Sequence, residues 1–246
     1  MLNMKAMIFA AGMGTRLRPL TDTIPKALVE VAGKTLLERA ILHLASQGVT
    51  YIVINVHHHA DQIIRFVQNH GYFGLNIFFS DESNELLETG GGLLKAEKHL
   101  IGKEPFVVIN SDVISNINIP DMMEAHKKNK ALVTLAVRNR PQSSRQLLFD
   151  ENRHLCGKTD RNKGLVQISL EKPNLSEFAF SGIQIVSPEW FSKQKYSGKF
   201  SIIDAYLELC KTNKIIAFLH DDDYWFDVGS IEKIEEAEKF FSNGKR

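Results

Sequence analysis

The feature that most constrains the fold is a regular alternation of short apolar runs and helical segments. Residues 5–10, 51–56 and 106–110 are apolar runs of the length expected for buried parallel strands. Residues 35–47 carry apolar side chains at helical spacing, and residues 60–69 predict a further helix. Parallel strands joined by helices form a sheet that is covered on both faces. The sequence therefore predicts an α/β fold with a mostly parallel sheet flanked by helices.

The alternation loosens between residues 138 and 180. This stretch is polar and rich in turn-forming residues, which favours hairpins. Strand and helix patterns return at 178–186 and 201–210, and the chain shows no internal repeat, low-complexity tract or linker. We therefore expect a single domain over residues 1–246, with a substrate-side insertion around 138–180.

Charge and cysteine content narrow the class of protein. The chain has 30 basic and 29 acidic residues, and a formal net charge of +1 disfavours a general nucleic-acid partner. No apolar stretch approaches the ~20 residues of a membrane span. Cys156 and Cys210 form no metal-like pair and are interpreted as reduced thiols. We expect a cytoplasmic monomer or small homo-oligomer without nucleic-acid or membrane partners.

The loop after the first apolar run reads AAGMGTRLRPLTDTIPK, from residue 10 to residue 26. Loops at the carboxyl edge of a parallel sheet are where open α/β folds bind ligands. Gly12 and Gly14 allow backbone N–H groups to face an anion, and Arg16 and Lys26 add positive charge. The third glycine of a dinucleotide-binding loop is missing, which disfavours an oxidoreductase, and no P-loop lysine follows. The loop predicts a local site for a nucleotide polyphosphate.

The whole string, with its Pro-Lys-Ala-Leu ending, closely resembles the signature loop of the sugar-1-phosphate nucleotidyltransferases. Three more segments resemble that family in the right order: Leu-Glu-Thr-Gly-Gly-Gly at 87–92, Val-Ile-Asn-Ser-Asp at 108–112 and Trp-Phe-Asp-Val-Gly at 225–229. The resemblance runs from residue 5 to about residue 237. It implies the Rossmann-like fold of the nucleotide-diphospho-sugar transferases.

The resemblance also implies how the chain meets an NTP. The nucleotide would lie against Ala11, Gly12, Gly14, Thr15, Arg16 and Lys26 on the first loop and Glu88, Thr89 and Gly90 on the second. Arg16 would contact the outgoing phosphates and Lys26 the reacting centre. Asp112 and Asp227 resemble the family's metal-binding aspartates, and hard carboxylate oxygens suit Mg²⁺. The implied reaction is attack by a sugar 1-phosphate oxygen on the α-phosphorus of the NTP, with loss of pyrophosphate.

The acceptor side is implied by two further segments. Phe-Ser-Gly-Ile at 180–183 resembles the family's sugar-side strand, which assigns Ser181 and Gly182, and Leu-Glu-Lys-Pro at 170–173 assigns Lys172 to the sugar phosphate. A lactyl carboxylate on the acceptor would suit one of Arg138, Arg140 and Arg145.

Among short members of the family, the chain most resembles the N-acetylmuramate-1-phosphate uridylyltransferases of cell-wall recycling. This resemblance favours UTP and N-acetylmuramate 1-phosphate as substrates. Mannose- or heptose-1-phosphate guanylyltransferases, choline-phosphate cytidylyltransferases and a catalytically inactive nucleotide-binding module remain as alternatives.

Overall fold

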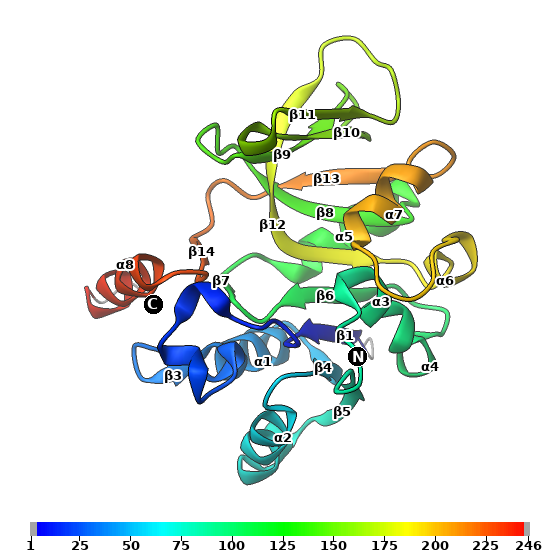
Figure 1. The fold of residues 1–246 in the computed structure, drawn as a ribbon. Helices are drawn as coiled ribbons and strands as arrows, with labels where there is room; N and C mark the ends of the chain where they lie inside the picture. The colour runs from blue at the N-terminus through cyan, green and yellow to red at the C-terminus, as the bar shows by residue number, and fades with distance from the viewer. Residues whose placement is uncertain (1–3, 244–246) are drawn as a thin grey trace.

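The computed structural model describes residues 4–243, and within them a ten-stranded sheet runs through the molecule (Figure 1). Its parallel part has the strand order β6 (Phe106–Asn110), β1 (Met4–Phe9), β4 (Val49–Val56) and β5 (Asn76–Asp81). A second parallel pair, β8 (Val133–Arg138) and β13 (Ile215–Leu219), is joined to β6 through the antiparallel strand β12 (Ser176–Val186). The predicted α/β class with a central, mostly parallel sheet is confirmed.

The inserted region continues the sheet at the edge away from β5. Strands β9 (Arg145–Phe149), β10 (Leu155–Asp160) and β11 (Leu165–Ile168) form an antiparallel meander that pairs with the start of β12. Figure 1 shows it at the top of the view, beyond β13. The predicted hairpins are confirmed, and they extend the sheet that carries the parallel strands.

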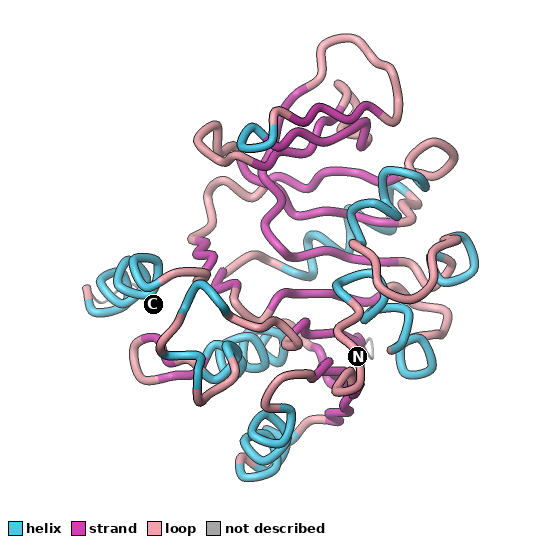
Figure 2. Tube along the Cα trace, viewed as in Figure 1, coloured by secondary structure: helices cyan, strands magenta, loops and turns pink. Residues whose placement is uncertain are grey.

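Helices cover both faces of the sheet (Figure 2). One buried cluster lies under α1 (Leu36–Ser46), α2 (Ala60–Asn69) and α5 (Ile119–Asn129). The other lies under α3 (Glu88–Lys95), α4 (Glu97–Leu100), α6 (Trp190–Lys193) and α7 (Ile202–Leu209). Within the described residues, no helix is long and apolar enough to cross a membrane.

Helix α1 illustrates how local sequence produces these elements. The side chain of Thr35 accepts a hydrogen bond from the backbone N–H of Glu38 at 3.0 Å and caps the first turn. The buried face then carries Leu37, Ile41 and Leu44 at helical spacing against the sheet.

A third cluster fixes the glycine-rich loop. The fully buried side chain of Leu17 packs with Val31, Val228 and Ile234, and so ties the loop to α8 (Ile231–Ser242). Val31 lies in a short hairpin of β2 (Glu30–Val31) and β3 (Lys34–Thr35). The loop is therefore anchored by apolar packing beside its flexible glycines.

A small antiparallel ladder joins β7 (Val113–Ser115) to β14 (Trp225–Asp227) and pairs Asp227 with Val113. The backbone N–H of Val228 also donates to the carbonyl of Asp112 at 2.8 Å. This ladder, which the sequence did not predict, brings two segments together that lie far apart along the chain.

The glycine triplet at 90–92 lies inside a helix, because α3 begins at Glu88. A Cβ at Gly90 would lie 2.2 Å from the ring of Phe200, and one at Gly91 would lie 2.2 Å from the carbonyl oxygen of Gly198. The triplet therefore allows the 198–200 segment to pack against α3.

Candidate functional site

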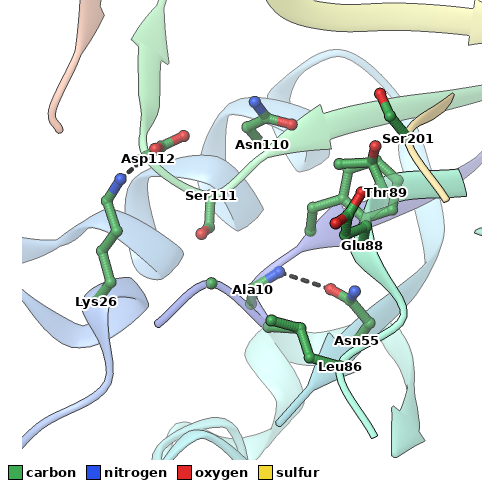
Figure 3. A pocket seen from close by; sticks show the side chains of 13 residues that line it. Ala10, Lys26, Asn55, Leu86, Glu88, Thr89, Asn110, Ser111, Asp112 and Ser201 are labelled. Carbon is green, nitrogen blue, oxygen red and sulfur yellow. Dashed lines mark hydrogen bonds and ion pairs between the residues drawn. The ribbon is translucent and has the colours of Figure 1, made fainter. Parts of the chain in front are cut away.

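A cavity of about 330 Å³ opens at the carboxyl ends of the parallel strands (Figure 3). It is lined by Ala10, Ala11 and Gly12 after β1, by Glu88 and Thr89 at the start of α3, and by Asn110, Ser111 and Asp112 after β6. This is the edge at which open α/β sheets bind ligands. We refer to it as the nucleotide-side cavity.

The two loop glycines have different surroundings. A side chain at Gly12 would meet no atom within 4 Å, which leaves that part of the cavity open. Gly14 has φ +64°, and a Cβ there would lie 2.9 Å from Thr21 Cγ2. The hydroxyl of Thr21 also donates to the carbonyl of Gly14 at 2.8 Å. Gly14 is thus required by the turn itself, whereas Gly12 leaves space for a ligand.

Lys26 and Asp112 meet at one end of the cavity. Their side chains form an ion pair and are only 12% and 20% exposed (Figure 3). Lys26 is the first residue of a 3₁₀ turn that follows Pro25, and Asp112 lies in the turn after β6. A half-buried ion pair of this kind keeps both charges at the cavity wall, where an anionic ligand would meet the lysine.

The β7–β14 ladder brings Asp227 close to Asp112 and Lys26. Burial raises the pKa of Asp227, and the nearby Asp112 carboxylate raises it further, while Lys26 and Arg16 oppose that rise. Arg16 itself lies over Gly229, because a Cβ there would be only 2.8 Å from its Nη2 atom. The structure thus brings the four residues Arg16, Lys26, Asp112 and Asp227 close to one another.

The carboxylates of Asp112 and Asp227 are hard oxygen donors of the kind that divalent cations prefer. The Asp112 carboxylate adds to the rise in the pKa of Asp227 that burial causes, and a shared cation of higher charge than lysine would relieve that repulsion. Among residues 4–243, no group of three or more His, Cys, Asp or Glu side chains could hold a metal ion. Asp112 and Asp227 could supply two ligands, with the others from substrate oxygens and water.

A second, larger cavity of about 730 Å³ adjoins the first and shares Glu88 and Ser201 with it. Asp227 and Trp225 lie on its wall, and residues between 140 and 165 supply most of the remainder. Four cationic side chains line this acceptor-side cavity: Arg140, Arg145, Lys158 and Lys163.

The three arginines of the insertion have different surroundings. The guanidinium of Arg138 is occupied by backbone carbonyls of the 220–223 turn, at 2.5 to 3.0 Å. Arg145 lies 3.7 Å from Asp160 and its side chain is 83% exposed. Arg140 is half-buried and stacks over the ring of Trp225 at 4.7 Å. It also lies close enough to Asp227 for its charge to oppose the rise in that residue's pKa. Arg140 is therefore the arginine best placed to meet a ligand.

Three predicted sugar-side residues lie elsewhere. Ser181 is buried, with its hydroxyl 2.7 Å from His220 Nε2 and its carbonyl bonded to Trp225 Nε1. Gly182, at φ +76°, allows β12 to approach Asn110, since a Cβ there would lie 2.8 Å from the amide nitrogen. Neither residue lines a cavity described above, and both support the wall from behind.

Lys172 is exposed and lines neither cavity, so the structure does not bring it to the other predicted residues. Lys158 on β10 lies on the acceptor-side wall instead, paired with Asp204 of α7 at 2.5 Å. Gly90 is buried against Phe200 and also lies off the lining of the nucleotide-side cavity.

Thr89 makes a contact that the sequence did not suggest. Its hydroxyl accepts a hydrogen bond from the backbone N–H of Ile202 at 3.0 Å, so it caps α7. Ser201, the residue before α7, makes no capping bond with its own side chain. The start of α3 is thus tied to the helix that borders the acceptor-side cavity.

Sequence reasoning missed Asn55 and Glu82. Asn55 lines the nucleotide-side cavity and is 2% exposed, while Glu82 is fully buried behind it. The available signal was a polar residue near the end of each of two apolar strands. That signal was not used because the two residues belong to no motif.

Comparison with known proteins places these features among enzymes. The family model described as "Nucleotidyl transferase" matches residues 5–244. The N-acetylmuramate alpha-1-phosphate uridylyltransferase of Neisseria meningitidis is 32% identical, over 96% of this chain and 97% of that protein. The enzyme of the same name from Caulobacter vibrioides is 31% identical over 95% of both chains.

Longer relatives and solved structures extend the comparison. The mannose-1-phosphate guanyltransferase of Aspergillus oryzae is 33% identical over 92% of this chain, which spans only 61% of that protein. The crystal structure of HddC from Yersinia pseudotuberculosis, complexed with GMP-PN, superposes with a TM-score of 0.78 at 26% identity. That match covers 97% of this chain and 99% of the HddC chain.

Proposed function

The chain belongs to the nucleotidyl transferase family and is a sugar-1-phosphate nucleotidyltransferase, and we propose that it couples UTP with N-acetylmuramate 1-phosphate. The products would be UDP-N-acetylmuramate and pyrophosphate. The observation that carries this choice is the near-complete mutual coverage with two N-acetylmuramate alpha-1-phosphate uridylyltransferases.

The chemistry requires little acid–base catalysis from the protein. The attacking phosphate oxygen is already an anion at neutral pH, so the barrier is the approach of two anions. Positioning and neutralisation of charge then provide most of the rate enhancement. In this proposal the nucleotide-side cavity holds the NTP, the acceptor-side cavity holds the sugar, and the reaction occurs where they meet, beside Asp227.

The cationic residues divide the work. Lys26 would stabilise negative charge at the α-phosphate, leaving its ion pair with Asp112 as the substrates bind. Arg16, together with backbone N–H groups of Gly12 and Gly14, would hold the departing pyrophosphate. The remaining proposed nucleotide contacts are Ala11, Thr15, Glu88 and Thr89, whereas Gly90, which was also predicted as a contact, packs against Phe200.

A Mg²⁺ ion fits the donor chemistry of Asp112 and Asp227, and when bound it would neutralise phosphate charge at the reacting centre. The two carboxylates would hold it from the two segments that the β7–β14 ladder joins. The backbone N–H of Val228 donates to the carbonyl of Asp112, and Asp227 pairs with Val113, so the two acids are close to each other, which supports this assignment.

Arg140 supports an acidic acceptor. Its guanidinium stacks on Trp225 at the wall of the acceptor-side cavity, whereas backbone carbonyls occupy the guanidinium of Arg138. A lactyl carboxylate, which muramate carries and mannose lacks, would be a suitable partner for Arg140. We therefore assign Arg140 rather than Arg138 or Arg145 to this group.

A guanylyltransferase acting on mannose or heptose 1-phosphate is the second candidate. The likeness to the Aspergillus guanyltransferase and to HddC with its guanine nucleotide analogue favours it. A panel of four NTPs against these sugar 1-phosphates, followed by pyrophosphate release, tests both candidates. Efficient GDP-sugar formation without turnover of UTP and the muramate phosphate would reject the proposal.

We also infer that residues 138–180 act with the central sheet as one domain, because their strands pair directly with β12. Both cysteines are free thiols, which supports a reducing, cytoplasmic location.

A further inference from the structure

Buried hydrogen bonds link the ends of three neighbouring strands behind the nucleotide-side cavity. The backbone N–H of Ala10, after β1, donates to Asn55 Oδ1 at 2.7 Å (Figure 3). Asn55 Nδ2, on β4, donates to Glu82 Oε1 at 2.7 Å. The other carboxylate oxygen of Glu82, after β5, accepts from the backbone N–H of Leu87 at 3.1 Å. The roles proposed above use neither the Asn55 nor the Glu82 side chain.

The donors and acceptors of this network match in one orientation only. The N–H groups of Ala10 and Leu87 can only donate, so each needs an oxygen. Glu82 supplies two accepting oxygens when ionised. Asn55 must then turn its oxygen toward Ala10 and its amide nitrogen toward Glu82. Each partner therefore fixes the orientation of the next.

The network fixes a strained part of the cavity wall. Leu87 immediately precedes Glu88, which has φ +58° and lines both cavities. The left-handed region is unfavourable for a residue with a side chain, so the surrounding structure has to maintain it. The N–H of Leu87 is held by Glu82, and its carbonyl accepts from the backbone N–H of Phe200 at 3.2 Å.

The fit around Glu82 also explains a glycine. A Cβ at Gly92 would lie 2.6 Å from Glu82 Oε1 and 3.1 Å from Asn55 Nδ2. Gly92 therefore leaves the space that the two side chains occupy. Asn55 and Glu82 are packed between the glycine-rich loop at 10–26 on one side and α3 on the other.

We propose that Asn55 and Glu82 form a positioning pair that sets the distance between the glycine-rich loop at 10–26 and the 86–89 segment. The cavity is then formed before a nucleotide enters, and binding spends less free energy on ordering loops. The pair acts on nucleotide affinity and leaves recognition of the sugar unchanged. This inference rests on the proposed function in one respect, that an NTP is the ligand of the nucleotide-side cavity.

The decisive variant is Glu82→Gln, which preserves shape but replaces one accepting oxygen with an amide that donates. One N–H group then faces another, and one bond of the network is lost. We expect the Kd for UTP, measured by calorimetry on the full chain with Mg²⁺, to rise about tenfold. The KM for the sugar phosphate should stay within about twofold.

The double variant Asn55→Asp, Glu82→Gln provides the rescue. The carboxylate introduced at position 55 would accept from Ala10 with one oxygen and from the amide introduced at position 82 with the other. The remaining oxygen of that amide would still accept from Leu87. All three hydrogen bonds and the single negative charge are restored, with the direction of one bond reversed. We expect the UTP Kd to return to within about threefold of the wild-type value.

Thr134→Val is the matched control for loss of a buried hydrogen bond. Thr134 is fully buried and bonds His126 Nδ1 at 2.9 Å, and it lines neither cavity. Urea unfolding should show a loss of stability comparable to that of Glu82→Gln, while the UTP Kd remains at the wild-type value. Equal weakening of UTP binding in this control would overturn the inference.

Other outcomes separate this inference from the proposed function. A wild-type UTP Kd in Glu82→Gln, or a double variant as weak as the single one, overturns the positioning pair alone. If the wild-type chain binds a different NTP, the same variants are measured with that nucleotide and only the choice of UTP fails. If it binds none of the four NTPs, both proposals fail.

Discussion

The two cavities are built from different materials. The nucleotide-side cavity is formed by strand ends, backbone groups, the buried side chain of Asn55 and the half-buried side chain of Thr89. The acceptor-side cavity is lined mostly by residues of the 140–165 stretch, among them the cationic Arg140 and Lys158. The first is fixed by the packing of the sheet, whereas the second carries exposed and half-buried charged side chains, such as Arg145 and Lys158. We therefore expect the strand ends to serve the reaction and the insertion to select the acceptor.

The largest expected effect lies where the cavities meet. Asp112→Asn and Asp227→Asn should each lower kcat at least about a hundredfold, or about 3 kcal/mol of barrier, because each removes a charged metal ligand. The loss should be the same for every acceptor, since the proposed function assigns both residues to the reacting centre. Initial rates with two sugar phosphates at saturating Mg²⁺ measure it, and near-wild-type turnover in both variants would remove the metal assignment.

Substitutions of Lys26 and Arg16, which both belong to the proposed nucleotide site, should affect different kinetic constants. Lys26→Ala should lower kcat about thirtyfold with a smaller change in the KM for NTP, because its charge acts where negative charge grows in the transition state. Arg16→Ala should act more on the KM for NTP. Steady-state kinetics with the NTP varied measures both, and a Lys26→Ala enzyme with normal kcat and raised KM would place the lysine in ground-state binding.

Arg140 tests whether the acceptor side acts independently. Arg140→Ala should raise the KM for N-acetylmuramate 1-phosphate about tenfold, the cost of one lost charge-assisted hydrogen bond, and leave the KM for UTP unchanged. Steady-state kinetics with each substrate varied in turn measures this.

The matched control is Arg145→Ala, which removes an exposed arginine from the same cavity wall. It should change the acceptor KM less than about threefold, since exposed ion pairs contribute little. Equal effects of the two variants would mean that the cavity attracts anions through its overall charge and that Arg140 has no specific role.

The nucleotide-side and acceptor-side cavities also differ in how well their residues could be predicted from the sequence. Residues 106–110 read as a strand, so Asp112 was expected at the carboxyl edge of the sheet, where the structure has it. Such predictions succeed because strand polarity and loop position follow from local sequence. The placement of Asp227 depends on the β7–β14 ladder, a contact between distant segments that no local pattern indicates.

The acceptor-side residues show more clearly what local sequence patterns cannot predict. Ser181 and Gly182 were assigned to the sugar, yet a bulge in β12 turns them toward His220 and Asn110. Burial lowers the pKa of His220 to about 4, so it contacts Ser181 as a neutral ring at pH ~7. Side-chain direction at a bulge depends on register, and a shift of one residue reverses the face.

The smallest expected effect concerns the hydrogen bond that links the start of α3 to α7, between the two cavities. Thr89→Val keeps the shape of the side chain but removes the hydroxyl that caps α7 at Ile202. The free energy of unfolding should fall by about 1 kcal/mol, the usual cost of a lost cap. Ser201→Ala should cost less than about 0.5 kcal/mol, because Ser201 makes no capping bond. Urea unfolding of the two variants measures the difference.

Kinetics on Thr89→Val then assigns the hydroxyl to one region or the other. If its function is to cap α7, the KM for UTP should change less than about twofold, since a cap costs stability rather than nucleotide contacts. A tenfold rise in that KM with unchanged stability would mean that the hydroxyl faces the nucleotide. In that case α7 would be held by its own packing, through Ala205 and Tyr206, and the two cavities would be coupled through the lining residues that they share, Glu88 and Ser201.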